Sequence, residues 1–457
     1  MSNPTFNGNR RGITLPDEFP PRPTSMLRNE LHRMNSKIEK KENYTLVLLC
    51  LTYFIYGSGI GIYGPLYPQQ AILHRVPTYI YGPAMAINFL VALLFYPVAC
   101  MMVASISCKQ SVSTGIFMIG VCKVLFGTLA LVAANPFIIL SYSIQIIEGI
   151  GFSILLASTY VTIFSQISDK AHRNRGIMQL FFILGISLSP IWGEAVYRAF
   201  DFSIPFYGIG VLSILNGIFV AAMLPEPDQK ILNQEMSIIS WTKKRRMYVY
   251  FVVIFTTFVY SGFLVVVLDP YLRQFHLNKL FVGCLFAVPY FICGLSAPAW
   301  NWLSKKGVNS VLLICIASIL IFASLILIGP ASFTKLELTL TYVSTSLLLN
   351  GLGTGGKLAC VSYSATRDLR SRQSVNGSPS PLMIPTMFAF GSMLGYFSGS
   401  VIAGFAYFYL GMGKAVYILF GFEIISATVA FIFAFRRNYV NPRNIEEAEE
   451  QRPILET

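Results

Sequence analysis

Charged residues are scarce in this chain. Asp, Glu, Lys and Arg make up 12% of its 457 residues, hydrophobic residues make up 54%, and the mean hydropathy is +0.60. Ordinary soluble domains carry about 25% charged residues, so the composition excludes a typical soluble globular protein. Long apolar runs replace the missing charge, and they are long enough to cross a lipid bilayer as helices. We therefore predict an all-α polytopic membrane protein.

Groups suited to metal binding or catalysis are also few. The four histidines form no metal-ligand spacing, and no serine or cysteine lies in a recognisable nucleophile motif. The eight cysteines lie within apolar runs or, for Cys108, at the edge of one, so no structural disulfide is expected. We expect the protein not to be an enzyme and to hold no metal or other cofactor.

About twelve apolar runs, separated by short polar connections, predict about twelve transmembrane helices. They lie at residues 45–67, 79–104, 112–134, 137–164, 176–200, 204–224, 247–268, 281–303, 308–329, 338–363, 382–406 and 413–435.

Polar segments divide the chain further. Residues 1–44 lack the early apolar core of a signal peptide, so we expect a disordered cytoplasmic tail there. Residues 225–246 form the longest internal connection and carry mixed charge, which predicts a cytoplasmic linker. It separates one six-helix bundle at residues 45–224 from a second at 247–435, and a second cytoplasmic tail follows at 436–457.

Acidic residues are outnumbered by basic ones, 21 to 34, which gives a net charge of +13. About 26 of the basic residues fall in the tails and on one set of alternate loops, and about six fall on the opposite set. By the positive-inside rule, both termini are cytoplasmic. The basic excess thus indicates topology and attraction to the lipid bilayer. It does not indicate nucleic-acid binding, because no stacking aromatics are interleaved with it.

Two motifs recur at similar distances in the two halves. Gly64-Pro65 lies at the outer end of the first span, and Asp269-Pro270 lies at that of the seventh, about 205 residues later. Glu148-Gly-Ile-Gly in the fourth span is followed by Asn350-Gly-Leu-Gly in the tenth, about 202 residues later. The joint spacing indicates a duplication around a central path, although Gly-x-Gly alone is also typical of close helix packing.

These motifs, with Gly185-Ile-Ser-Leu-Ser-Pro190-Ile-Trp-Gly193 in the fifth span, make the sequence similar to the major facilitator superfamily. Within it, the chain resembles the vesicular amine transporters, especially their polyamine-transporting branch. The resemblance covers nearly everything between the tails. It implies the major facilitator fold, with two six-helix pseudo-repeats, and proton-coupled exchange of a small organic cation, an amine or polyamine, by alternating access.

Several positions depart from the family pattern. The loop between the second and third helices keeps only Lys109 of a charge clasp, Gln145 replaces an Arg, and Glu194 replaces a glycine. Lys357 stands near the place where amine-transporting relatives carry an acid, which leaves open a carrier of an anionic solute that uses Lys357. The incomplete clasp and the long polar N-terminus leave open a transporter-derived sensor or scaffold that binds a ligand or partner without net transport.

Five ionisable residues fall well inside predicted spans: Lys123, Glu148, Glu194, Lys357 and Glu423. A charge at a helix centre costs about 2.5 to 3.5 kcal/mol on insertion scales unless it is paired or solvated. Each of these residues is therefore either a functional group on a solvent path or part of a buried pair that fixes packing. We assign Lys357 to the cytoplasmic gate, and we also expect Pro190 and Gly185 of the fifth span to take part in gating.

The resemblance places the first, fourth, seventh and tenth helices around the path. Gln145 and Glu148 share one face of the fourth span, and Tyr56 and Tyr63 share one face of the first. With Tyr260 of the seventh, we expect these residues to bind the substrate. The tyrosine rings would hold an organic cation over their faces. Plain packing or anchoring at the membrane interface is the alternative use of these rings.

Asp269 directly precedes Pro270. Because a proline disfavours helical conformation at the preceding residue, we expect the helix to stop or bend at Asp269 and leave its carboxylate at the outer rim of the path. A proton and a cationic substrate would compete there, so we predict that Asp269 binds substrate and couples transport to protons, together with Glu148 and Glu194. The alternative is a helix-terminal residue paired with Arg273.

The C-terminal tail resembles an acidic dileucine sorting signal, since Glu450 lies four residues before Ile454-Leu455. An ordinary acidic tail is the alternative. Together with the family resemblance, the signal favours a multi-pass protein of vesicular or endolysosomal membranes. Its expected partners are a small organic solute, protons, the lipid bilayer and a sorting adaptor at the C-terminal tail.

Overall fold

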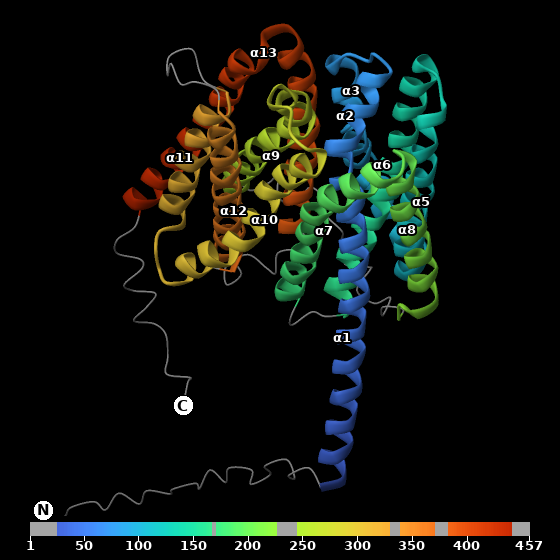
Figure 1. Ribbon diagram of the computed structural model, residues 1–457. Helices are drawn as coiled ribbons and strands as arrows, with labels where there is room; N and C mark the ends of the chain where they lie inside the picture. Colours follow the sequence, from blue (N-terminus) through green and yellow to red (C-terminus); the bar gives the residue numbers. More distant parts are fainter. Residues whose placement is uncertain (1–24, 167–170, 226–244, 330–338, 371–382, 441–457) are drawn as a thin grey trace, which may run out of the picture. The chain divides into compact units, whose positions relative to one another are not determined.

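The computed structural model describes residues 25–166, 171–225, 245–329, 339–370 and 383–440. The chain divides into two compact units, Met1–Tyr44 and Thr45–Thr457. Helix α1 (Ser25–Gly61) begins in the first unit, within the residues predicted as a disordered tail, and ends in the second unit. The second unit holds all the remaining helices (Figure 1).

All regular elements of the described residues are helical. After α1 they are α2 (Tyr63–Leu73), α3 (Thr78–Ala84), α4 (Ile87–Ser105), α5 (Cys108–Gly127), η1 (Thr128–Leu131), α6 (Ala134–Gln166), α7 (Ala171–Ala199), α8 (Ser203–Met223), α9 (Arg245–Leu272), η4 (Arg273–Phe275), α10 (Lys279–Lys305), α11 (Ser310–Ile328), α12 (Leu340–Arg370) and α13 (Met383–Val440).

Ten helical segments of the described residues are long and apolar enough to cross a membrane. One of them, Met383–Ile432, contains two helices of α13 joined at Gly411, whose φ of 71° lies in the left-handed region that favours glycine. α12 is another long helix, with 31 residues, and polar residues such as Asn350 and Lys357 dilute its apolar run. The prediction of an all-helical polytopic membrane protein with about twelve long helices is confirmed.

The helices of the second unit pack around a shared seam. α5 packs against α6 and α8, while α13 packs along α9 and α12 packs against α10 and α11. Across the seam, α7 contacts α10, α2 contacts α9, and α3 and α4 contact α13 (Figure 1). Helices from the first six predicted spans therefore touch helices from the last six directly.

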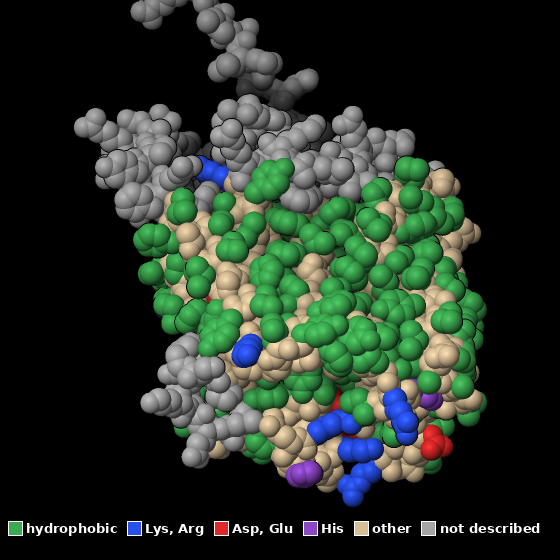
Figure 2. All heavy atoms as spheres, turned by 90° about the horizontal axis from the view of Figure 1, so that it is seen from above, with side chains coloured by type: hydrophobic (Ala, Val, Ile, Leu, Met, Phe, Trp, Pro, Cys, Tyr) green, Lys and Arg blue, Asp and Glu red, His purple; other side chains and the backbone are tan. Residues whose placement is uncertain are grey.

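The surface of the second unit suits a lipid environment. Large apolar side chains such as Leu295, Ile319 and Ile139 are each 67% exposed. Figure 2 shows hydrophobic side chains over most of the described surface seen from above, with most of the visible Lys and Arg side chains near one edge. Exposed apolar surface of this extent, on helices long enough to cross a bilayer, is typical of a surface that contacts lipid.

Helix α9 does not stop at Asp269. It continues through Pro270 to Leu272 and then into η4. The predicted stop was wrong because the proline lies in the last turn of the helix, where neighbouring helices and local 3₁₀ adjustments satisfy the freed backbone groups.

Candidate functional site

A cavity of about 360 Å³ lies on the seam between the two sets of helices. α1, α4, α6 and α7 line it on one side, and α9, α10, α12 and α13 line it on the other. The first, fourth, seventh and tenth spans thus all contribute to one cavity, as the family resemblance implies. Its volume lies in the range of small-molecule binding pockets.

Aromatic side chains form much of the cavity wall. Its aromatic lining residues are Tyr53, Tyr56, Phe89, Phe152, Tyr160, Phe182, Phe258, Phe286, Tyr290, Phe388 and Tyr396. The Tyr56 ring stacks with Phe152 at 4.7 Å and with Phe182 at 5.9 Å between ring centroids. Phe89 and Tyr396 approach to 4.6 Å across the seam. Flat rings therefore shape the space for an apolar solute.

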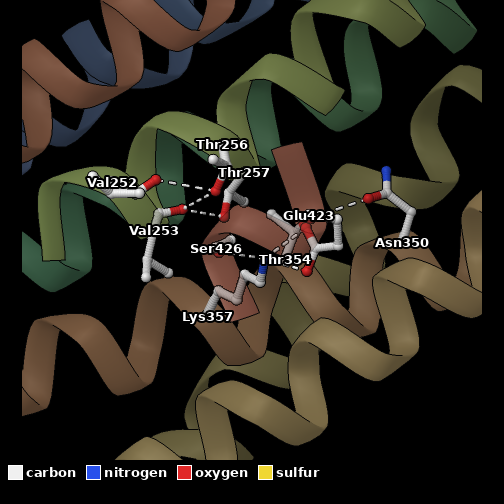
Figure 3. Close-up of polar contacts among 9 residues, drawn as sticks. All are labelled: Val252, Val253, Thr256, Thr257, Asn350, Thr354, Lys357, Glu423 and Ser426. Carbon is white, nitrogen blue, oxygen red and sulfur yellow. Dashed lines mark hydrogen bonds and ion pairs between the residues drawn. The ribbon is translucent and has the colours of Figure 1, made fainter. Parts of the chain in front are cut away.

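Few polar groups face the cavity, and Arg175 is the one charged residue among the described residues that line it. Its Nη2 donates a long hydrogen bond of 3.4 Å to Ser362 Oγ, across the seam. The buried hydroxyls of Tyr53 and Tyr56 have no hydrogen-bond partner in the described part of the chain. Asn350 Oδ1 accepts a hydrogen bond of 3.2 Å from Thr354, so its amide nitrogen remains available (Figure 3).

Of the residues predicted from sequence, Tyr56 lines the cavity. The other predicted substrate-binding, proton-coupling and gating residues are not among its lining residues: Tyr63, Gln145, Glu148, Gly185, Pro190, Glu194, Tyr260, Asp269 and Lys357. Two buried ion pairs contain Glu148 and Lys357, with Tyr63 and Gln145 beside the first, and a polar cluster at one end contains Glu194 and Asp269. Close backbone contacts between helices involve Gly185 and Pro190. Tyr260 shares a hydrogen bond of 2.9 Å with Ser324.

The first ion pair joins α5 and α6. Lys123 Nζ lies 2.7 Å from Glu148 Oε1, and the side chains are 1% and 0% exposed. Tyr63 donates a hydrogen bond of 2.8 Å to Glu148 Oε2, and Lys123 Nζ lies 3.8 Å from the centroid of the Tyr63 ring. The Gln145 amide is buried nearby on α6, without a hydrogen-bond partner among the described residues. Glu148 is thus neutralised within the protein and does not face the cavity.

The second ion pair joins α12 to the later part of α13. Lys357 Nζ lies 2.6 Å from Glu423 Oε1 and 2.8 Å from Oε2, and it donates a third hydrogen bond of 3.2 Å to Ser426 (Figure 3). Lys357 is fully buried and points away from the cavity, which its neighbours Thr354 and Leu358 line. Each set of six spans therefore contains one buried Lys–Glu pair.

A third group, the outer polar cluster, consists of Gln69, Glu194, Asp269 and Arg273. Gln69 Nε2 lies 2.5 Å from Glu194 Oε1. Arg273 donates to Asp269 Oδ2 from Nη2 at 2.9 Å and from Nε at 3.1 Å. Glu194 and Asp269 are 0% and 4% exposed and interact electrostatically. The Arg273 pairing that was considered as an alternative for Asp269 is thus present.

Backbone contacts close the seam beside this cluster. A Cβ atom at Gly283 of α10 would lie 2.5 Å from the Pro190 carbonyl oxygen and 3.3 Å from Glu194 Cγ of α7. A Cβ atom at Gly64 would lie 2.8 Å from the ring of Phe286. The seam is therefore closed where α2 and α9 end, which the predicted topology makes the outer side. The cavity extends towards the inner side, where α7 and α13 begin, as far as Arg175 and Phe388.

Gly185 also serves helix packing. A Cβ atom there would collide with the Phe54 carbonyl oxygen of α1, and Ser58 Oγ donates to the Gly185 carbonyl oxygen at 3.4 Å. The contact holds α7 against α1, which places the cavity-lining face of α7 next to Tyr53 and Tyr56.

Sequence reasoning missed Arg175, because it was counted with the basic residues that set topology. A signal was nevertheless present. Arg175, Gln179, Phe182, Ile183 and Ile186 follow the spacing of one helical face, and all five line the cavity. A basic residue in register with such a face can line the cavity, whereas a basic residue in a loop cannot be placed on the face by its spacing.

Comparison with known proteins agrees with this architecture. The profile of the Major Facilitator Superfamily matches residues 49–378. The MFS-type transporter SLC18B1 of Homo sapiens is 24% identical over 415 residues, which cover 86% of this chain and 88% of the human protein.

Two solved structures share the fold. A bacterial homolog of the human lysosomal transporter Spinster, in an inward-facing and occupied conformation, matches with a TM-score of 0.65 and 13% identity, over 85% of this chain and 96% of that chain. The human organic anion transporter MFSD10 (TETRAN) matches with a TM-score of 0.60 and 14% identity, over 85% of this chain and 99% of that chain. At these identities the likeness shows the fold alone.

Proposed function

This chain belongs to the major facilitator superfamily, and from that premise we propose that it is a secondary active transporter that carries a small organic solute by proton-coupled alternating access. The solute would occupy the aromatic cavity. The outer polar cluster would carry the proton. The closed outer side and the cavity extending inward correspond to the inward-facing state of such a cycle.

The observation that carries this proposal is the environment of Glu194. Its side chain is fully buried, its Oε1 accepts from Gln69, and its Oε2 has no hydrogen-bond partner among the described residues. No ion pair joins Glu194 to a cation in the part of the chain that the structure describes. Because an unpaired buried carboxylate is costly, we propose that Glu194 holds a proton while the outer side is closed.

Opening of the outer side would release this proton. Gly283 and Pro190 must separate when α7 and α10 move apart, and Glu194 lies one turn beyond Pro190 on the same helix. Water would then reach Glu194 and stabilise its charged form. Asp269 lies within electrostatic range and is already paired with Arg273, whose side chain is 42% exposed. We propose that Asp269 sets the field at Glu194 and joins the same protonation cycle.

The predicted amine or polyamine substrate has limited support from the cavity. Aromatic rings can hold a cation, but neighbouring rings stack on Tyr56, and Lys123 already occupies the ring of Tyr63. No Asp or Glu is among the described residues that line the cavity. We therefore assign proton coupling to the outer polar cluster. The residues that line the cavity would determine the charge of the solute.

The test is transport by the purified full chain in proteoliposomes, with a panel of small organic acids, amides and amines. We expect uptake that follows an imposed pH gradient and collapses when the gradient is dissipated. Glu194→Gln should abolish gradient-driven uptake but retain exchange at equal pH, because a neutral amide cannot cycle a proton. Asp269→Asn should reduce gradient-driven uptake, and Asp201→Asn, at an exposed outer carboxylate, should leave it unchanged. Equal gradient-driven uptake by wild type and Glu194→Gln would refute the assignment.

We also propose that the chain resides in a vesicular or endolysosomal membrane with both termini cytoplasmic. The support is the distribution of basic residues and the dileucine pattern at Ile454-Leu455, which lies outside the described residues. A sorting adaptor would bind the dileucine pattern of this tail.

A further inference from the structure

The geometry points to an organic anion with an apolar body as the ligand of the central cavity, and to Arg175 as the residue that binds its anionic group. This inference rests on the proposed transport function and names the substrate class for the same cavity. It replaces the cation implied by family resemblance, and it moves the anion-binding role from Lys357 to Arg175.

Charge balance inside the second unit singles out Arg175. The buried lysines Lys123 and Lys357 each have a carboxylate within 2.7 Å. Arg175 has no ion-pair partner among the described residues, and its hydrogen bond to Ser362 is long, at 3.4 Å. A cationic group in an aromatic cavity without a carboxylate gains strongly from an anionic ligand.

Hydrogen-bond donors gather around the same end of the cavity. Tyr53 lies within electrostatic range of Arg175, and its buried hydroxyl has no partner among the described residues. The Tyr56 hydroxyl, about one helical turn further along α1, is unpartnered in the same way. A guanidinium offers a planar fork of N–H groups that fits two oxygens of a carboxylate or phosphate, and the phenol hydroxyls can complete the shell. Among the described residues, Arg175 has only the long hydrogen bond to Ser362, and the two phenol hydroxyls have no hydrogen-bond partner.

The rest of the cavity suits the apolar body of such a ligand. Beyond Arg175, the stack of Phe152, Tyr56 and Phe182 provides one flat wall, and Phe89 with Tyr396 provides another. A cation in this space would lie near an uncompensated guanidinium and would have no carboxylate to bind. An amphiphilic anion, in contrast, can place its charged group at Arg175 and its apolar body between the aromatic rings.

Three probes with one apolar body test the sign of the charge: 4-phenylbutyrate, its neutral amide 4-phenylbutanamide, and the cation 4-phenylbutylamine. Binding to the purified full chain is measured by titration calorimetry and by thermal stabilisation. We expect the acid to bind more tightly than the amide, and the amine most weakly. Arg175→Gln should weaken acid binding about 10- to 100-fold and leave amide binding unchanged.

Further variants separate the role of Arg175 from general effects. Arg175→Lys should give an intermediate loss, because it keeps the charge and loses the fork. Arg198→Gln removes an exposed arginine of the same helix and should leave acid binding unchanged. If Arg175→Gln does not fold, Tyr53→Phe is the variant that tests the inference. Because it removes one hydrogen-bond donor, it should weaken binding of the acid several-fold and leave binding of the amide unchanged.

Several outcomes would overturn the inference: equal or tighter binding of the amine, binding of none of the three probes, or unchanged acid affinity in Arg175→Gln. Acid binding without counterflow would leave this site standing and remove the transport proposal. Gradient-driven transport of the amine without acid binding would do the reverse. A fourth probe, oleate, identifies the source of the anion. Tighter binding of oleate than of 4-phenylbutyrate assigns the site to single-chain lipid anions, and the opposite order assigns it to water-soluble organic acids.

Discussion

Replacing Lys123 with Met should destabilise the protein severely, because it leaves Glu148 buried without its cation. The two charged atoms lie 2.7 Å apart, and neither side chain is more than 1% exposed. Breaking a buried pair on one side typically costs about 3 to 5 kcal/mol. Each 1.4 kcal/mol changes an equilibrium tenfold. The ratio of folded to unfolded protein should therefore fall by about two to three and a half orders of magnitude relative to wild type.

The double variant Lys123→Met/Glu148→Met should recover most of this loss. Replacing a whole buried pair by apolar residues of similar volume is often neutral or stabilising, although the Tyr63 hydroxyl would lose its acceptor, Glu148 Oε2. Tight packing at Gly59, where a Cβ atom would lie 2.9 Å from Lys123 Cε, favours an unbranched replacement such as Met. The double variant should also keep its gradient-driven transport, because the outer polar cluster is intact.

Thermal unfolding in detergent and transport in proteoliposomes measure the two consequences in a double-mutant cycle. A single variant as stable as wild type would refute the argument that the pair compensates two buried charges. A stable double variant without proton coupling would instead return Glu148 to the coupling role that the sequence suggested. The variant Glu148→Gln alone cannot separate these cases, because it also leaves Lys123 unpaired.

Two further variants test the gate and the tail. Gly283→Ala places a Cβ atom 2.5 Å from a backbone carbonyl oxygen of α7, so it should hold the outer side open. A cysteine introduced at Leu268, in the cavity wall, should then react faster with a membrane-impermeant maleimide added from the outer side than it does without Gly283→Ala. Gly208→Ala, which has open space at its Cβ, is the control. Unchanged labelling in Gly283→Ala would contradict closure of the seam at the outer side. Alanine at both Ile454 and Leu455 should move the chain to the cell surface in fluorescence images; unchanged vesicular staining would remove the sorting proposal.

The positions of the helices could be predicted from the sequence, because a bilayer selects long apolar runs whatever their tertiary neighbours. The eighth predicted span at residues 281–303, for example, lies within Lys279–Lys305 of the structure. The break between the last two spans was also predicted, and it occurs at Gly411, within the gap between 406 and 413. The length of each helix is a local property of the chain.

The pairing of charges could not be predicted in the same way. Lys357 and Glu423 lie 66 residues apart, and their contact depends on how α12 and α13 are rotated about their axes. When a helical face carries small and polar residues, its sequence does not specify which neighbouring helix it contacts. Glu148 and Lys123 were both recognised as buried charges, but their pairing needs the contact between α5 and α6. Hence Glu148 and Lys357, which were assigned to the path and the gate, each form an ion pair with a buried residue that was not.

The placement of the remaining charges bears on the direction of coupling. A cationic solute and a proton that compete for one carboxylate must cross in opposite directions. The structure instead separates Glu194 at the closed outer side from Arg175 at the inner end of the cavity. An anion on Arg175 and a proton on Glu194 do not compete, so both can be bound in one state and cross together with little net charge. Acidification of the side from which the solute leaves should then stimulate its transport, whereas a competing cation would require acid on the opposite side. The sign of the pH gradient that drives uptake therefore distinguishes cotransport from exchange.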